Sequence, residues 1–274
     1  MQKKVFANIF AVSGEKMQEV REILNWYLLS GVDEISGDEP CKVLTAESRS
    51  GTTKLEPSVD IRPATTLLAQ ENKAACLNAK DRCKQATNLK ELKDILQHFE
   101  GCSLKFSANS TVFGDGNPEA EVMLIGEAPG AEEDRQGKPF VGRSGQLLEK
   151  MLGAIGISRE QCYITNILPW RPPGNRTPTG DEVAVCRPFL MRQIELIKPK
   201  VIFLLGASAA NAVLGNNDSI SSMRGKILEL SLENGEKISA LASFHPAYLL
   251  RNGAQKAKSW SDLLRLKRYL TNNN

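Results

Sequence analysis

Four short apolar segments in the second half of the chain constrain its fold more than any other feature. They cover residues 122–126, 163–168, 201–206 and 238–244. Their lengths suit buried strands. Helical patterns lie between them, at residues 144–156, 181–198 and 207–214. Alternating strands and helices are typical of a parallel sheet covered on both faces. We therefore expect a three-layer α/β/α fold with a four-stranded, mainly parallel sheet.

The first hundred residues differ from the second half of the chain in composition and in hydrophobic periodicity. Residues 15–30 place apolar side chains at mostly helical spacing, whereas residues 36–66 are rich in Ser, Gly, Pro, Thr and charge. The second composition is typical of a mobile linker. The sequence therefore predicts an N-terminal helix (1–35), a low-complexity linker (36–66), a helical extension (67–98) and an α/β domain (99–274).

Composition and cysteine content favour a globular protein of the reducing cytoplasm. Apolar residues make up 41% of the chain, and its six cysteines are too sparse for a disulfide scaffold. No apolar run approaches the roughly 20 residues that cross a bilayer. A short apolar run follows Lys3 and Lys4, but it lacks a convincing signal-peptide cleavage site. We expect a cytoplasmic protein with no membrane partner.

The distribution of charge is more informative than its sum. A net charge of +3 does not by itself indicate nucleic-acid binding. From Arg251 onward, however, six basic residues stand against Asp262 alone. Such a local excess suits a phosphate backbone, and a solubilising terminal helix explains it equally well.

Binding residues of a parallel sheet gather where its strands end. The first strand leads into the turn GEAPG at 126–130, where Gly and Pro can direct backbone N–H groups toward a ligand. A glycine-flanked loop then carries Phe140, which can present its ring to a base or simply pack in the core.

Two further strand ends carry polar side chains. Asn166 offers one acceptor and two donors, which complement N3–H and O4 of uracil but not the reversed pattern of cytosine. Capping of a turn is the alternative. His245 precedes a Pro turn and could donate a hydrogen bond to an oxyanion, while Leu249 and Leu250 could wedge into a base stack. A structural histidine is the alternative there.

Taken in order, these motifs resemble those of the family-four uracil-DNA glycosylases, members of the uracil-DNA glycosylase superfamily. The matching motifs are GEAPG (126–130), KPFVGRSG (138–145), ITN (164–166), RPPGNR (171–176) and HPAYLLR (245–251). The resemblance spans roughly residues 99–270 and includes a segment around Gly225. It implies an enzyme that flips uracil out of DNA and hydrolyses its bond to deoxyribose, leaving an abasic site in base excision repair.

The resemblance also implies residue roles. Phe140 would stack on the flipped uracil, Asn166 would read N3–H and O4, and Ala128 and Pro129 would line the pocket. His245 would stabilise the negative charge on uracil O2.

The group that positions water is left open, because Ala128 and Gly130 stand where the best-known branch of the superfamily has Asp and Tyr. Glu127 is our candidate, with backbone carbonyls as the alternative. The residues expected to contact DNA are Arg171, Asn175, Arg176, Tyr248, Leu249, Leu250 and Arg251.

The chain departs from the family at its metal ligands. Family-four enzymes usually hold a four-iron, four-sulfur cluster through a Cys-x-x-Cys pair and two later cysteines. Here Lys105 and Trp170 replace two of the four, and only Cys102 and Cys186 match. Such clusters require four thiolates, so we expect no cofactor, with Trp170 packed in the cluster's place. Substitution by other cysteines of the chain is the alternative.

The main alternative function is a noncatalytic DNA-binding or polymerase-associated module that retains the glycosylase fold. A pure binder does not need Glu127, Phe140, Asn166 and His245 together, which favours an enzyme. A Rossmann dinucleotide enzyme is excluded because no G-x-G-x-x-G pattern is present. The expected partner is uracil-containing DNA, with replication or repair proteins as further candidates, and we expect a monomer.

Overall fold

The computed structural model describes residues 64–272, and its centre is one mixed sheet of six strands in the order β1-β3-β2-β4-β6-β5. The four central strands run parallel to one another. They are β2 (Val122–Gly126), β3 (Cys162–Asn166), β4 (Val201–Leu205) and β6 (Lys237–Ser243). Every residue of β2, β3 and β4 is buried, which explains their continuous apolar sequence.

The expected strand number is wrong at the two edges of the sheet. β1 (Asp115–Gly116) pairs antiparallel with β3, and β5 (Ile227–Ser231) pairs antiparallel with β6. Within the described residues the sheet therefore has six strands rather than four. β1 is only two residues long, and only one residue of β5 is buried, so neither forms a continuous apolar run.

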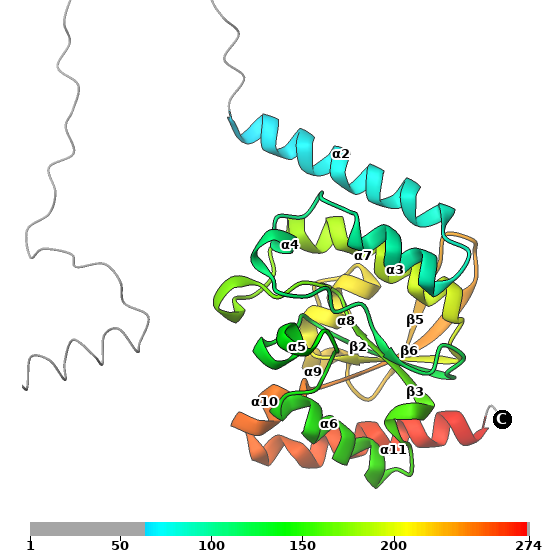
Figure 1. The fold of residues 1–274 in the computed structure, drawn as a ribbon. Helices are drawn as coiled ribbons and strands as arrows, with labels where there is room; N and C mark the ends of the chain where they lie inside the picture. The colour runs from blue at the N-terminus through cyan, green and yellow to red at the C-terminus, as the bar shows by residue number, and fades with distance from the viewer. Residues whose placement is uncertain (1–63, 273–274) are drawn as a thin grey trace, which may run out of the picture. The chain divides into compact units, whose positions relative to one another are not determined.

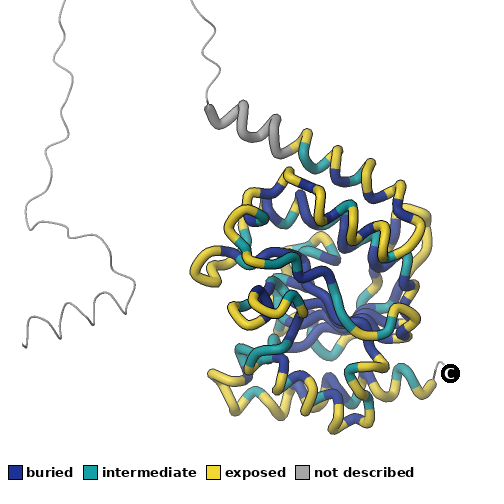
Figure 2. Tube along the Cα trace, in the orientation of Figure 1, coloured by how far each residue is buried: buried dark blue, intermediate teal, exposed yellow. Residues whose placement is uncertain are grey.

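Different helices cover the two faces of this sheet (Figure 1). Helices α6 (Arg143–Ala154) and α11 (Lys256–Asn272) pack with Val122 and Leu124 of β2. Helices α7 (Gly180–Ile197) and α8 (Ala207–Leu214) belong to the cluster on the other face. The three-layer α/β/α arrangement is thus confirmed, with the buried strands between partly exposed helices (Figure 2).

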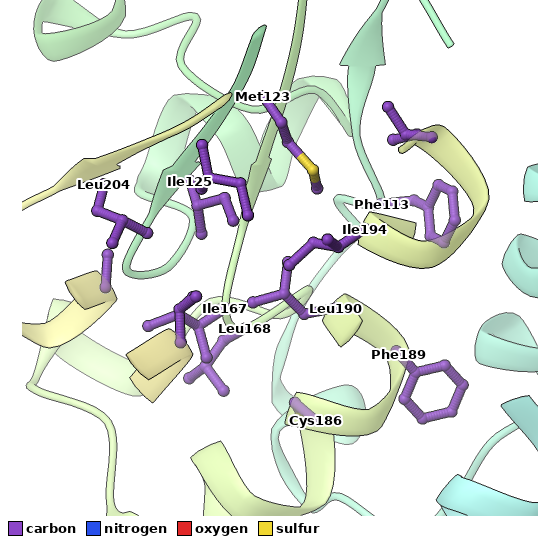
Figure 3. Packing of buried hydrophobic residues seen from close by; sticks show 14 of the residues in the cluster. Phe113, Met123, Ile125, Ile167, Leu168, Cys186, Phe189, Leu190, Ile194 and Leu204 are labelled. Atoms are coloured by element: carbon purple, nitrogen blue, oxygen red, sulfur yellow. The ribbon is translucent and has the colours of Figure 1, made fainter. Parts of the chain in front are cut away.

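The larger core lies between the sheet and α7. Met123 and Ile125 of β2 and Leu204 of β4 face Leu190 and Ile194 of α7 (Figure 3). Since successive strand residues point to opposite faces, one continuous apolar strand supplies both cores.

The helical patterns of the extension correspond to α2 (Ala64–Gln85) and α3 (Leu89–Gln97). Both helices pack on α7. Arg192 of α7 also donates two hydrogen bonds to the carbonyl of Ala86, which follows α2. The predicted N-terminal helix and most of the predicted linker lie outside the described residues.

Shorter elements connect these layers. They are α4 (Leu104–Ser107), α5 (Ala131–Gln136), α9 (Ile220–Met223), α10 (Pro246–Arg251), and the 3-10 turns η2 (Arg159–Gln161), η3 (Pro173–Asn175) and η4 (Gly253–Gln255). Across residues 64–272, no helix combines the length and apolar character needed to cross a membrane.

Candidate active site

A pocket of about 420 Å³ lies at the carboxyl ends of the parallel strands. It is walled by the loops that follow β2, β3 and β6 and by the segment between α5 and α6. All six residues expected to act on uracil line it: Glu127, Ala128, Pro129, Phe140, Asn166 and His245. The parallel register explains this convergence, because Gly126 at the end of β2 pairs with Asn166 at the end of β3.

Asn166 holds an unsatisfied polar atom in this pocket. Its side chain is buried, with 5% of the residue exposed, and its Oδ1 atom accepts no hydrogen bond. Leaving a buried acceptor unpaired costs about 1–3 kcal/mol. A ligand with an N–H at this point would remove that cost.

Gly126 allows Asn166 and Phe140 to approach each other. A Cβ atom at Gly126 would lie 2.4 Å from Oδ1 of Asn166 and 2.5 Å from Cζ of Phe140. Any other residue there would displace one of the two side chains. Glycine in the GEAPG turn is therefore required by side-chain packing in the pocket.

Phe140 lies on the pocket wall beside His245. The centres of the two rings are 5.6 Å apart, and their planes are inclined by 32°. The Phe140 backbone has a φ of +52°, in the left-handed region that phenylalanine rarely adopts. Strain of this kind persists only where surrounding contacts hold it.

Glu133 is a site residue that the sequence did not reveal. Its buried carboxylate accepts hydrogen bonds from the N–H groups of Gly130 (3.1 Å), Val141 (3.0 Å) and Gly142 (2.8 Å). It thus ties the GEAPG turn to the loop that carries Phe140. The spacing of Glu133 three residues after the Gly130 cap was the available signal, since a glutamate there commonly returns to the start of its helix.

His245 caps α10 and is held in one tautomer. Its Nδ1 atom accepts a hydrogen bond from the backbone N–H of Ala247 at 3.1 Å, so the neutral ring carries its proton on Nε2. Burial and then the charge of Arg251 lower the pKa of His245 to about 4. The lowered pKa favours the neutral imidazole, which can donate one hydrogen bond.

The expected DNA contacts divide into two groups. Asn175, Arg176, Tyr248 and Arg251 line the pocket. Arg171 lies outside its lining and donates a hydrogen bond to Oδ1 of Asn175 at 2.8 Å.

One of the expected DNA contacts needs correction, and another is paired with a carboxylate of the protein. Leu249 is 1% exposed and lies between α6 and α11, so it cannot insert into a base stack, whereas Leu250 is 41% exposed. Arg176 forms two hydrogen bonds to the Glu182 carboxylate, at 2.9 and 2.6 Å, so its charge is already paired. Glu182 is itself fixed by the capping box that it forms with Thr179.

Three of the four positions of the family's metal ligands lie in a packed core. Cys102 and Cys186 are buried, and a hydrogen bond between their thiols lowers the pKa of Cys102. Trp170 lies in the same cluster, with its Nε1–H donated to Oγ1 of Thr111 at 3.0 Å. Lys105 donates to the carbonyl of Gln97 instead of presenting a thiolate. Two thiols do not fit a cluster that needs four.

No group of three or more His, Cys, Asp or Glu side chains suited to a metal ion occurs among the described residues. The cysteines of α2 have other surroundings. The Cys76 thiol contacts the carbonyl of Ala184, and burial raises the pKa of the Cys83 thiol to about 12.

Sequence comparison gives the family of this chain. The profile of the uracil DNA glycosylase superfamily matches residues 113–264. The chain is 44% identical to the Type-4 uracil-DNA glycosylase of Thermotoga maritima over 158 residues, which are 57% of this chain and 80% of the relative. It is 40% identical to that of Archaeoglobus fulgidus over 185 residues, 65% of this chain and 92% of the relative. The corresponding protein of Saccharolobus solfataricus is 40% identical over 190 residues, 67% of this chain and 87% of the relative. Together with a pocket that brings the expected motifs to one place, these matches establish that the chain belongs to the uracil-DNA glycosylase superfamily.

Proposed function

We infer that this protein is a uracil-DNA glycosylase, which hydrolyses the N-glycosidic bond between uracil and deoxyribose and leaves an abasic site for base excision repair. The observation that carries this inference is the unpaired, buried Oδ1 atom of Asn166. The N3–H of uracil would satisfy it, and the amide NH₂ would donate to O4. Cytosine would bring its N3 lone pair against the same oxygen, so two acceptors would face each other in a buried site.

The rate of this reaction depends less on a strong base that activates water than on a hydrogen-bond donor to the departing uracil. When the C1′–N1 bond breaks, its electron pair stays with uracil, and the sugar becomes an oxocarbenium-like cation. The Nε2–H of His245 would donate to O2 of the departing anion, where it would stabilise the transition state more than the ground state. Water then adds to C1′ and loses a proton to solvent, while the uracil anion takes one up, so the products are free uracil and an abasic sugar.

Glu127 is our candidate for orienting that water. It is partly exposed on the pocket wall, on the same turn as Ala128 and Pro129. Its carboxylate would also face the cationic sugar with a favourable charge. The backbone carbonyls of the turn remain the alternative.

Base flipping costs a few kcal/mol, and the pocket rim offers groups that can offset it. Leu250 is the exposed apolar side chain of α10 and is the candidate wedge. Arg251 and Tyr248 lie beside it on the pocket rim, where the arginine can meet a phosphate.

The protein should work without an iron–sulfur cluster, because only two of the four thiolates are in place. Anaerobically purified protein is expected to be colourless, without the broad absorbance near about 400 nm typical of such clusters. Chelators should leave excision intact. A Lys105→Cys, Trp170→Cys double variant, which restores the family's ligand set, serves as the positive control for the purification. Stoichiometric iron and acid-labile sulfide in the wild type would contradict the proposal.

The dependence of the excision rate on pH should show that the active form of His245 is neutral. With a pKa of about 4, the ring gains its second proton only in acid, and that proton on Nδ1 would oppose the N–H of Ala247. Single-turnover excision should therefore be flat between about pH 6 and pH 8 and fall as the pH drops toward 4. A rate that falls as the pH rises through about 6.5 would mean that the charged ring is required.

The function is tested with oligonucleotides that carry one uracil, as single strands and as duplexes. The wild-type protein should release free uracil and leave an alkali-labile site at that position alone. Tight binding without release of the base would instead favour the noncatalytic DNA-binding or polymerase-associated alternative.

A further inference from the structure

The strained backbone of Phe140 is held by a side chain from outside the pocket. Arg159, in η2, donates from Nη1 to the carbonyl of Phe140 at 3.0 Å and from Nη2 to the carbonyl of Pro139 at 2.6 Å. Two consecutive carbonyls of the loop therefore converge on one guanidinium. This use of several fixed N–H donors is specific to arginine, since a lysine ammonium lacks the planar fork.

Arg159 is itself fixed by acidic partners on two other elements. Its Nε donates to Oδ2 of Asp115 on the edge strand β1 at 2.9 Å, and its Nη1 contacts Glu149 of α6 at 3.2 Å. Its side chain is only 15% exposed and that of Asp115 28%, so solvent screens this contact less than the contact with Glu149, which is 50% exposed. The guanidinium thus links the Phe140 loop to an edge strand and to a helix.

Contacts on its other sides leave the loop little freedom. A Cβ atom at Gly145 would lie 1.9 Å from the carbonyl oxygen of Phe140, so α6 packs directly against the loop backbone. Glu133 holds the next two N–H groups, those of Val141 and Gly142. Arg159 thus binds the carbonyls of Pro139 and Phe140, and Glu133 binds the N–H groups of the two residues that follow.

We propose that Arg159 is a positioning residue for uracil excision, acting only through the place it gives to the Phe140 ring. This proposal rests on the function proposed above, in which that ring stacks on the flipped base. Arg159 does not line the pocket, so it reaches the substrate only through the loop. A misplacement of about 1 Å in a reacting pair can cost about 100-fold in rate, so a loosened loop should be visible in kinetics.

A double-mutant cycle tests the proposal. Single-turnover excision is measured for wild type, Arg159→Ala, Phe140→Ala and the double variant, together with Kd for undamaged duplex. Arg159→Ala should slow excision by about 10- to 100-fold with little change in Kd. In the Phe140→Ala background the same change should cost less than about threefold, because the ring it positions is gone. Arg159→Lys should retain part of the rate.

Arg192→Ala is the matched control. Arg192 also donates two N–H groups to a backbone carbonyl, that of Ala86, and contacts Glu195 at 2.8 Å, but it lies outside the pocket lining. Its loss should lower Tm and leave the excision rate unchanged.

Two results would overturn the proposal: excision by Arg159→Ala at the wild-type rate, or an equal loss in both Phe140 backgrounds. Should Arg159→Ala not fold, Arg159→Lys enters the same cycle under the same criterion. Failure of the wild type to release uracil would contradict the function itself, whereas an active wild type with an additive cycle would contradict only the role of Arg159.

Discussion

His245→Ala is expected to slow single-turnover uracil excision by about 100- to 1,000-fold, the usual effect of removing one preorganised donor to a developing anion. The residue is half-buried, the pKa of its ring is lowered to about 4, and its Nδ1 atom accepts a hydrogen bond from the N–H of Ala247. Its one available proton is therefore on Nε2. Because the charge on uracil O2 develops only as the bond breaks, binding of an uncleavable uracil analogue should fall much less than the rate.

The same substitution removes a helix cap, and its controls must separate the two effects. Loss of an N-cap costs about 1 kcal/mol of stability. His245→Asn keeps a capping acceptor but is too short to place a donor as Nε2 does, so it should lose rate while Tm stays near wild type. His98→Ala, at the exposed end of α3, should change neither quantity. Wild-type excision by His245→Ala would reduce His245 to a turn residue.

Asn166→Asp should reduce uracil excision by about 100-fold or more, because a site built around one hydrogen-bond pattern rejects another strongly. The carboxylate keeps an acceptor for N3–H but loses the amide donor to O4. Binding to undamaged DNA should change little, since Asn166 is buried at the base of the pocket. A protonated carboxyl group would match cytosine, so weak release of cytosine is the expected gain.

Asn211→Asp is the matched control for this change. Asn211 also has a buried Oδ1 atom without a hydrogen-bond partner, but it lies on α8 outside the pocket. The control should excise uracil at the wild-type rate. If Asn166→Asp lost DNA binding and excision to the same extent, the amide would have a structural role instead.

The sequence predicts the centre of the fold well because the central strands are buried on both faces. Such strands are apolar throughout, and their lengths set them apart from helices. The edge strands lack this signal: β5 carries Glu229 and exposed Ile227, and β1 has only two residues. An edge strand also forms because it pairs with the strand beside it, and the local sequence pattern does not show that pairing.

Site residues at the ends of strands were predictable for a topological reason. Parallel strands bring Asn166 and His245 to the same edge of the sheet although 79 residues separate them in the chain. The role of Arg159 in holding the Phe140 loop was not predictable. Arg159 contacts Phe140 and Asp115 across 19 and 44 residues, and no short motif marks such contacts.

The two leucines of α10 show another limit of prediction from sequence. Leu249 and Leu250 are equivalent in sequence, but neighbouring helix residues point about 100° apart. Only the packing of α10 against α6 and α11 decides that Leu249 is buried and Leu250 exposed.

If the pocket stabilises uracil as an anion through His245, the effect of removing this side chain should depend on the leaving group. Fluorine at C5 is small enough to fit a uracil pocket and withdraws electrons, so the 5-fluorouracil anion needs less help from the protein. Single-turnover rates are compared for wild type and His245→Ala on matched duplexes with uracil or 5-fluorouracil. The variant is expected to lose about 100- to 1,000-fold in rate on uracil and several-fold less on 5-fluorouracil. An equal loss on both bases would contradict it.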